Sequence, residues 1–226
     1  MVLDALIAMN TARPPMTING TLLLAQWLSP SYPLGSFAYS HGLETAIAEG
    51  WVADAASLQD WLAELLASGS GRADAILLHA AYHADDPAPV DVTGRAFSSS
   101  AERLRESLHQ GAAFARTTCV AWGNDMPHLL LPVSLGHAAA RHNIPATLAA
   151  AMYLHAFASN IIMACVRLVP LGQTDGQRVL SALAQLIEAI AEETANATLD
   201  DLYSNTFMSD IAAMRHETLQ PRLFQS

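Results

Sequence analysis

PATLAAAMYLHAFASNIIMACVRLVP, residues 145–170, gives the strongest indication of how this chain folds. Its apolar side chains surround a helix on all sides instead of forming one stripe, which is typical of a helix buried within a protein or a membrane. Its most apolar part, LHAFASNIIMACVRLVP (154–170), is interrupted by Asn160 and Arg167, and we expect this part to fall short of a bilayer span. The stretch therefore predicts the central helix of a bundle.

The composition agrees with a helical protein. Of the 226 residues, 52% are hydrophobic but only 7% are aromatic, and alanine accounts for much of the difference. Small side chains favour closely packed helices. No stretch alternates in the way of a strand, and no repeat period is visible. We predict an all-α, single-domain bundle of about ten helices.

Apolar periodicity and breaker residues divide the chain into segments. We expect a mobile N-terminal arm at 1–20, a helical domain at 21–205 and a C-terminal partner-binding segment at 206–226. Asp54 and the triple serine 98–100 are expected to cap helices. The predicted helices cover 21–29, 37–50, 55–69, 72–84, 93–122 with a break at the serines, 133–143, 145–170 and 174–197, and 85–91 and 123–132 are predicted loops.

Charge and cysteine content limit the possible functions. The net charge of −10 disfavours binding to nucleic acid or to an anionic membrane. The chain contains no lysine, which excludes a Walker-type phosphate lysine and Schiff-base catalysis. Cys119 and Cys165 lie in apolar helical segments and are predicted to be free thiols, as in a reducing cytoplasm. No secretory signal opens the sequence, so we expect a cytoplasmic protein.

The segment SPSYPLGSFAYSHGLE, residues 29–44, suggests either a catalytic loop or a docking surface. Ser40 and His41 are neighbours, and adjacent side chains on a helix diverge by about 100°, so they are a poor nucleophile and base pair. No G-x-S-x-G setting surrounds the serine. We therefore expect Ser36 or Ser40 to cap a helix or to form another structural hydrogen bond.

His79 and His83 have the i, i+4 spacing of zinc ligands on a helix. The glutamate of an H-E-x-x-H motif is missing, and no paired E-x-x-H motifs suggest a dimetal bundle. We predict two partly exposed histidines near a helix end and no metal site.

Two segments near the C-terminal end suggest protein contacts. Arg167, in VRLVPLGQTDGQR (166–178), is a lone cation in an apolar setting and needs a carboxylate or carbonyl partner. Thr174 or Asp175 is the expected N-cap of the helix that follows. The terminal MRHETLQPRLFQS (214–226) is too polar for a core helix and too apolar for an inert tail, which is typical of a segment that orders on a partner.

Several blocks of the sequence form a recognisable set: LLLAQWLSPSYPLGSFAYSHGLE (22–44), GWV (50–52), ERLRESLHQG (102–111), IPATLAAAMYLHAFASNIIMACVRLVPLGQTDGQR (144–178), LDDL (199–202) and DIAAMRHETLQPRLFQS (210–226). Together they resemble the urease accessory protein UreF family. The resemblance implies an all-α homodimer without catalytic activity or a cofactor. Family members join UreD, also called UreH, and the GTPase UreG to deliver nickel to apo-urease.

The resemblance also assigns residues to partners. The side facing UreD/UreH is implied to include Tyr32, Phe37, Tyr39, Met214, Arg215, His216, Glu217, Arg222, Leu223 and Phe224. Arg167, Gln173 and Asp175 are implied to face UreG, and Tyr153 and His155 to lie at the dimer interface.

Two other functions stay open from the residues. A small all-α enzyme would have inward-facing polar groups around a buried ligand pocket. A nickel or zinc storage protein would need His-rich or Cys-rich tracts, which are absent from the sequence.

Overall fold

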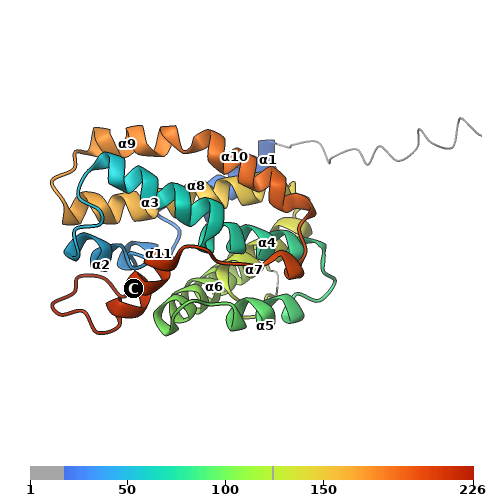
Figure 1. Ribbon diagram of the computed structural model, residues 1–226. Coiled ribbons are helices and arrows are strands. Elements are labelled where there is room, and N and C mark those ends of the chain that lie inside the picture. Colours follow the sequence, from blue (N-terminus) through green and yellow to red (C-terminus); the bar gives the residue numbers. More distant parts are fainter. Residues whose placement is uncertain (1–17, 124) are drawn as a thin grey trace, which may run out of the picture.

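A computed structural model describes residues 18–123 and 125–226 (Figure 1). Within these residues it contains helices and no strands, so the predicted all-α fold is confirmed. The elements are α1 (Ile18–Trp27), η1 (Ser36–Ala38), α2 (Leu43–Ala48), α3 (Ala55–Ser68), α4 (Ser70–His83), α5 (Ala88–Ala96), α6 (Ala101–Trp122), α7 (Leu131–Arg141), α8 (Ala146–Leu168), α9 (Gln173–Ala182), α10 (Ala184–Glu193), η2 (Thr194–Asn196), η3 (Leu199–Asp201) and α11 (Phe207–His216), where η denotes a 3-10 helix.

The expected N-terminal arm lies largely outside the described residues. Positions 1–17 are not described, and 18–20 form the first turn of α1. The arm therefore stays a prediction.

Helix α8 runs through the middle of the bundle, as its sequence predicts (Figure 1). It packs against α1, α2, α3, α4, α7, α9 and α10, and Leu154, Ala158 and Ile161 are fully buried along it. By length and mean hydropathy the whole of α8 could cross a membrane, whereas the prediction concerned only the shorter run 154–170. However, 56% of its most apolar window is buried inside the bundle, which explains its hydropathy without a membrane.

Small residues let the helices approach closely. Gly136 of α7 lies against the backbone of α4, where an added Cβ would be 2.2 Å from the carbonyl oxygen of Leu78. Gly111 of α6 meets the carbonyl oxygen of Leu129 in the same way. Helix α7 therefore packs closely against both α4 and α6.

The predicted helix caps at two positions are confirmed. Asp54 accepts a 2.9 Å hydrogen bond from the Ser57 amide and forms a capping box with it. The Ser100 hydroxyl accepts from the Arg103 amide and starts α6.

The structure corrects two predicted segments and one predicted cap. Residues 85–91 are only in part a loop, because α5 begins at Ala88 with a proline in its first turn, where no amide donor is needed. The single helix expected at 174–197 is divided at Leu183 into α9 and α10. Neither Thr174 nor Asp175 caps α9, which follows Gly172 and has no side-chain cap.

The helix expected at 37–50 is shorter than predicted. His41 and Gly42 have φ of 56° and 76°, in the left-handed region that ends a helix. Only η1 and α2 form, on either side of these residues. The resulting turn directs the chain toward the C-terminal segment.

The C-terminal segment is ordered on the bundle without a partner. Helix α11 packs against α2 and α6, and the end of the chain lies beside them (Figure 1). The composition of residues 214–226 did not predict this docking.

Candidate functional site: a loop and the C-terminal tail

Residues 32–39 and 214–226 meet to form what we call the loop–tail surface. The Gln225 amide donates a 2.8 Å hydrogen bond to the Ala38 carbonyl, and the Ser40 amide donates one of 2.8 Å to the Ser226 carbonyl. The Ser40 hydroxyl donates to the same Ser226 carbonyl. The two segments are therefore held together by backbone pairing.

Glu44, at the start of α2, anchors the tail. Its carboxylate accepts hydrogen bonds from the Leu223 and Phe224 amides, at 2.7 and 3.0 Å. The side chain is almost completely buried, so these two amides replace water around its charge.

His216 joins the tail to two helices. The imidazole is fully buried, with Nε2 3.2 Å from Glu44 Oε2 and Nδ1 2.7 Å from Glu102 Oε2. The other oxygen of Glu102 accepts from Arg222. In this structure His216 therefore stabilises the loop–tail surface from its buried side. Its predicted contact with a partner stays a prediction.

A second polar group lies deeper, between α2, α6 and α8. His41 Nε2 is 3.0 Å from Glu106 Oε1, Arg103 donates to the other Glu106 oxygen at 2.6 Å, and Gln110 donates to Oε1 at 3.0 Å. Burial opposes ionisation of Glu106, but Arg103 and His41 outweigh it and lower the pKa to about 2. Burial lowers the pKa of His41, and the Arg103 charge adds to this effect.

Asp74 of α4 accepts a 2.6 Å hydrogen bond from the Tyr153 hydroxyl. Burial raises the pKa of Asp74 to about 6, despite the nearby charge of Arg103. Burial also raises the pKa of Tyr153, and the Asp74 charge adds to the rise. Tyr153 is only 6% exposed, so of the two residues predicted at a dimer interface, only His155 lies on the outside of α8.

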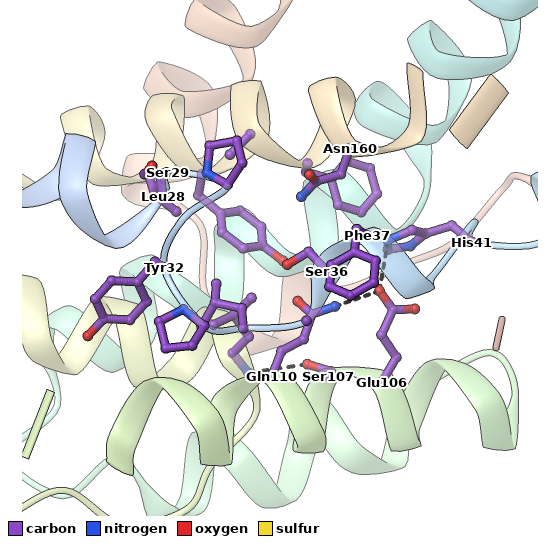
Figure 2. A pocket seen from close by; sticks show the side chains of 18 of the residues that line it. Leu28, Ser29, Tyr32, Ser36, Phe37, His41, Glu106, Ser107, Gln110 and Asn160 are labelled. Atoms are coloured by element: carbon purple, nitrogen blue, oxygen red, sulfur yellow. Dashed lines mark hydrogen bonds and ion pairs between the residues drawn. The ribbon is translucent and has the colours of Figure 1, made fainter. Parts of the chain in front are cut away.

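A cavity of about 170 Å³ lies between the 28–37 loop, α6 and α8 (Figure 2). His41, Glu106 and Gln110 point toward it and are already bonded to one another. Polar groups around a cavity are the feature expected of the enzyme alternative. However, Ser40 is engaged with Ser226, and His41 Nδ1 has no hydrogen-bond partner among the described residues, so Ser40 and His41 form no catalytic dyad.

The three aromatic residues of the loop have different positions. Phe37 is 72% exposed, whereas Tyr32 and Tyr39 are buried. The Tyr32 hydroxyl is 2.9 Å from Thr118 Oγ1, and the Tyr39 hydroxyl is 3.4 Å from His109 Nδ1. The two tyrosines therefore anchor the loop to α6, and Phe37 is the aromatic residue of the loop that faces outward.

The tail residues also divide into two groups. Leu223 is 78% exposed and Met214 is 54% exposed, while Phe224 is buried. Arg215 pairs with Glu49 on the surface, and Glu217 accepts from the Ala101 amide at the start of α6. Phe207, Met208 and Ile211 of α11 are exposed apolar residues that the sequence reasoning missed.

Arg167 has the carbonyl partner that was predicted for it. Its Nη2 donates a 2.8 Å hydrogen bond to the Phe37 carbonyl, and its Nε donates to the Met163 carbonyl. The guanidinium lies 4.5 Å from the centre of the Phe224 ring. Arg167 is exposed, at the edge where loop and tail meet, and Gln173 and Asp175 lie in the first turn of α9, where Asp175 pairs with Arg178.

His79 and His83, which were considered as metal ligands and not predicted to form a site, differ in exposure. His83 is exposed at the end of α4, as predicted, but the expectation that His79 is partly exposed is wrong. His79 is buried, and its Nε2 is 3.2 Å from the Ala191 carbonyl. No group of three or more potential metal ligands occurs within residues 18–123 and 125–226. Cys119 and Cys165 are free thiols, as expected.

Sequence reasoning did not identify the buried carboxylates that organise the site. Glu102 and Glu106 are four residues apart and thus share a face of α6, on the side that faces the core. The signal that could have found them is their spacing in line with Ala113 and Phe114, which continue the same buried face of α6.

Comparison with known proteins agrees with the resemblance in the sequence. The family model described as UreF matches residues 52–184. "Urease accessory protein UreF" of Cereibacter sphaeroides (strain KD131 / KCTC 12085) is 54% identical over 205 residues, covering 91% of this chain and 98% of the relative. The protein of the same name from Roseobacter denitrificans (strain ATCC 33942 / OCh 114) is 47% identical over 222 residues, covering 97% of this chain and 100% of the relative.

A third relative of that name, from Rhodopseudomonas palustris (strain HaA2), is 44% identical over 233 residues, with 96% of this chain and 98% of the relative covered. These matches extend over nearly the whole chain. The chain therefore belongs to the UreF family of urease accessory proteins, and it is a chaperone-type component of urease assembly and not an enzyme.

Proposed function

We propose that this chain is a scaffold that bridges UreD/UreH and the GTPase UreG and regulates GTP-dependent nickel insertion into apo-urease. In this proposal the chain works in the cytoplasm as a homodimer, with His155 near the dimer interface. UreD/UreH binds the loop–tail surface through its exposed residues, Phe37, Met214 and Leu223. UreG binds beside it, at Arg167, Gln173 and Asp175.

The observation that carries the proposal is the position of Arg167. Its side chain contacts both halves of the loop–tail surface, through the Phe37 carbonyl and the Phe224 ring. A partner that moves the loop or the tail must change the surroundings of this guanidinium. The two proposed partner sites are thus in direct contact through Arg167.

This arrangement gives a physical route by which one partner affects the other. Two binding sites are coupled when each ligand favours a different arrangement of a shared element. Here the shared element is the loop, the tail and Arg167. Binding of UreD/UreH would select the arrangement of Arg167 that UreG recognises.

Replacement of Arg167 by alanine tests the proposal. Because the side chain is exposed, the fold and UreD/UreH binding should be retained, while UreG capture by the UreD/UreH complex and urease activation should fall. Activation is measured in a strain that lacks this protein. Arg141→Ala removes another exposed arginine, from α7, and serves as the matched control.

Two outcomes would contradict the proposal. If Arg167→Ala activates urease as well as wild type does, Arg167 has no part in the mechanism. If the wild-type chain binds neither UreD/UreH nor UreG, the scaffold function itself is wrong.

A further inference from the structure

The outer face of α6 carries a basic ridge, which we define as Arg105, His109 and Arg116. The spacings of four and seven residues place the three side chains on one stripe of the helix, and all three are exposed. From first to last the ridge spans about 16 Å along the helix axis. Ala112 lies between His109 and Arg116, and its small side chain leaves space at the middle of the ridge.

The ridge is unusual for this chain, whose net charge is −10. The acidic residues of α6, Glu102 and Glu106, are buried and paired on the inner face of the helix. The exposed face therefore has positive charge with no carboxylate from the same helix to balance it.

The two arginines of the ridge, like Arg141 and Arg167, which hydrogen-bond only to carbonyls, are not paired with a carboxylate of this chain among the described residues. Ion pairs with carboxylates of this chain are made by Arg72, Arg95, Arg103, Arg178, Arg215 and Arg222. Arg105 and Arg116 make no such ion pair within the described residues. Their guanidinium groups are available to a carboxylate from outside the chain.

The ridge adjoins the loop–tail surface. His109 is the residue that approaches the Tyr39 hydroxyl, and Tyr39 directly precedes Ser40, which pairs with Ser226. A partner that covers the loop and extends along α6 would reach all three ridge residues.

We infer that the basic ridge docks an acidic segment of another protein of the urease assembly, and this inference rests on the proposed function. The fitting partner is a helix or extended segment whose carboxylates recur over about 16 Å, the span of the ridge. Arg105 and Arg116 would form ion pairs at the two ends, and Ala112 lets the partner backbone approach between them. Such pairs mainly raise the association rate and weaken with salt.

Charge reversal tests this inference on the full-length chain. Purified UreD/UreH, UreG and apo-urease are each titrated against wild type, the double variant Arg105→Glu/Arg116→Glu and the control Arg141→Glu, in 50 and 300 mM NaCl. We expect the double variant to lower the association rate for one of these proteins at least tenfold in low salt, with a smaller effect in high salt. Arg141→Glu, which reverses one exposed arginine on α7, should stay within about twofold of wild type.

The outcomes separate this inference from the proposed function. If the partners bind wild type and the double variant equally well, the ridge is not a docking site, although the scaffold function stands. If no partner binds wild type, both are wrong. Size-exclusion chromatography with light scattering tests whether the ridge instead contacts a second copy of this chain. If wild type is a dimer and the double variant is not, a second copy occupies the ridge and the inference is wrong.

Discussion

The Nδ1 atom of His216 lies 2.7 Å from the Oε2 atom of Glu102, although the two residues are 114 positions apart. Both side chains are buried, and Glu44 approaches the imidazole from the other side. The contact ties α11 to α6 and places the residues after it. The tail is therefore a part of the folded domain, held by buried polar groups.

His216→Ala should destabilise the protein strongly. It leaves two buried carboxylates without the hydrogen-bond partner between them, and a buried polar group that loses its partner costs about 1–3 kcal/mol, with more for a charged group. The free energy of unfolding in urea measures the loss. Arg215→Ala, which removes only the exposed ion pair with Glu49, should cost less than about 1 kcal/mol; equal losses in the two variants would contradict the role of His216.

The same contacts limit how the tail can be tested by deletion. A chain cut after Met214 loses His216, so failure to bind a partner would not distinguish a lost contact from a destabilised fold. Substitution of an exposed residue is the sharper experiment.

Leu223→Asp should weaken UreD/UreH binding about tenfold or more, because it places a charge on the most exposed apolar residue of the tail. The Glu44 contacts use the backbone of Leu223 and should persist, so stability should change by less than about 0.5 kcal/mol. Isothermal titration gives the affinity. Val92→Asp alters another exposed apolar residue, on α5, and unchanged binding in Leu223→Asp would remove the tail from the interface.

Asp74→Asn should change how stability depends on pH. Burial raises the pKa of Asp74 to about 6 in the folded protein, above its value of 3.8 in the unfolded chain. The folded state therefore binds more protons between these values, and this contribution to stability is present below pH 3.8 and is lost as pH rises through about 6.

The free energy of unfolding of the Asp74→Asn variant, relative to that of wild type, should thus rise by on the order of 2 to 3 kcal/mol from pH 4 to pH 7. Urea unfolding across this range measures the difference. Glu106 has the opposite effect, because its pKa is lowered to about 2 in the folded protein. Its contribution to stability is present above pH 4.5 and is lost as the pH falls toward 2. The exposed Asp60→Asn is the control, and a constant difference between Asp74→Asn and wild type would contradict the assignment.

Gly136→Ala should destabilise the bundle by about 3 kcal/mol, because its Cβ would overlap the Leu78 carbonyl oxygen and force α4 and α7 apart. Thermal unfolding measures the change. Gly172→Ala is the control, since its Cβ would meet only the Asp175 side chain at 3.2 Å. A small loss of stability in Gly136→Ala would contradict this prediction, because it would mean that α4 and α7 can move apart at little cost in free energy.

The fold was predictable where the signal is local. The all-round apolar run of α8 and the caps at Asp54 and Ser100 depend on neighbouring residues, and all three predictions are confirmed. The start of α5 was missed because proline suggests a loop, although proline is also suited to the first turn of a helix. No breaker residue marks the division at Leu183.

The candidate site was predictable only in part. Composition identified the loop and the tail as unusual segments, but it gave no indication that they pair with each other. Whether Tyr39 or Phe37 faces outward depends on His109, which lies 70 positions after Tyr39. The roles of Glu44 and Glu102 likewise depend on contacts across more than 100 residues.

The pairing of Ser226 with Ser40 has a practical consequence for anyone who prepares this protein. Ser226 is only 2% exposed, and its carbonyl receives both the amide and the hydroxyl of Ser40. An affinity tag joined directly after it would start from a buried position and compete with these bonds. A tag at the opposite end of the chain avoids this junction and is the better choice for every binding experiment described above.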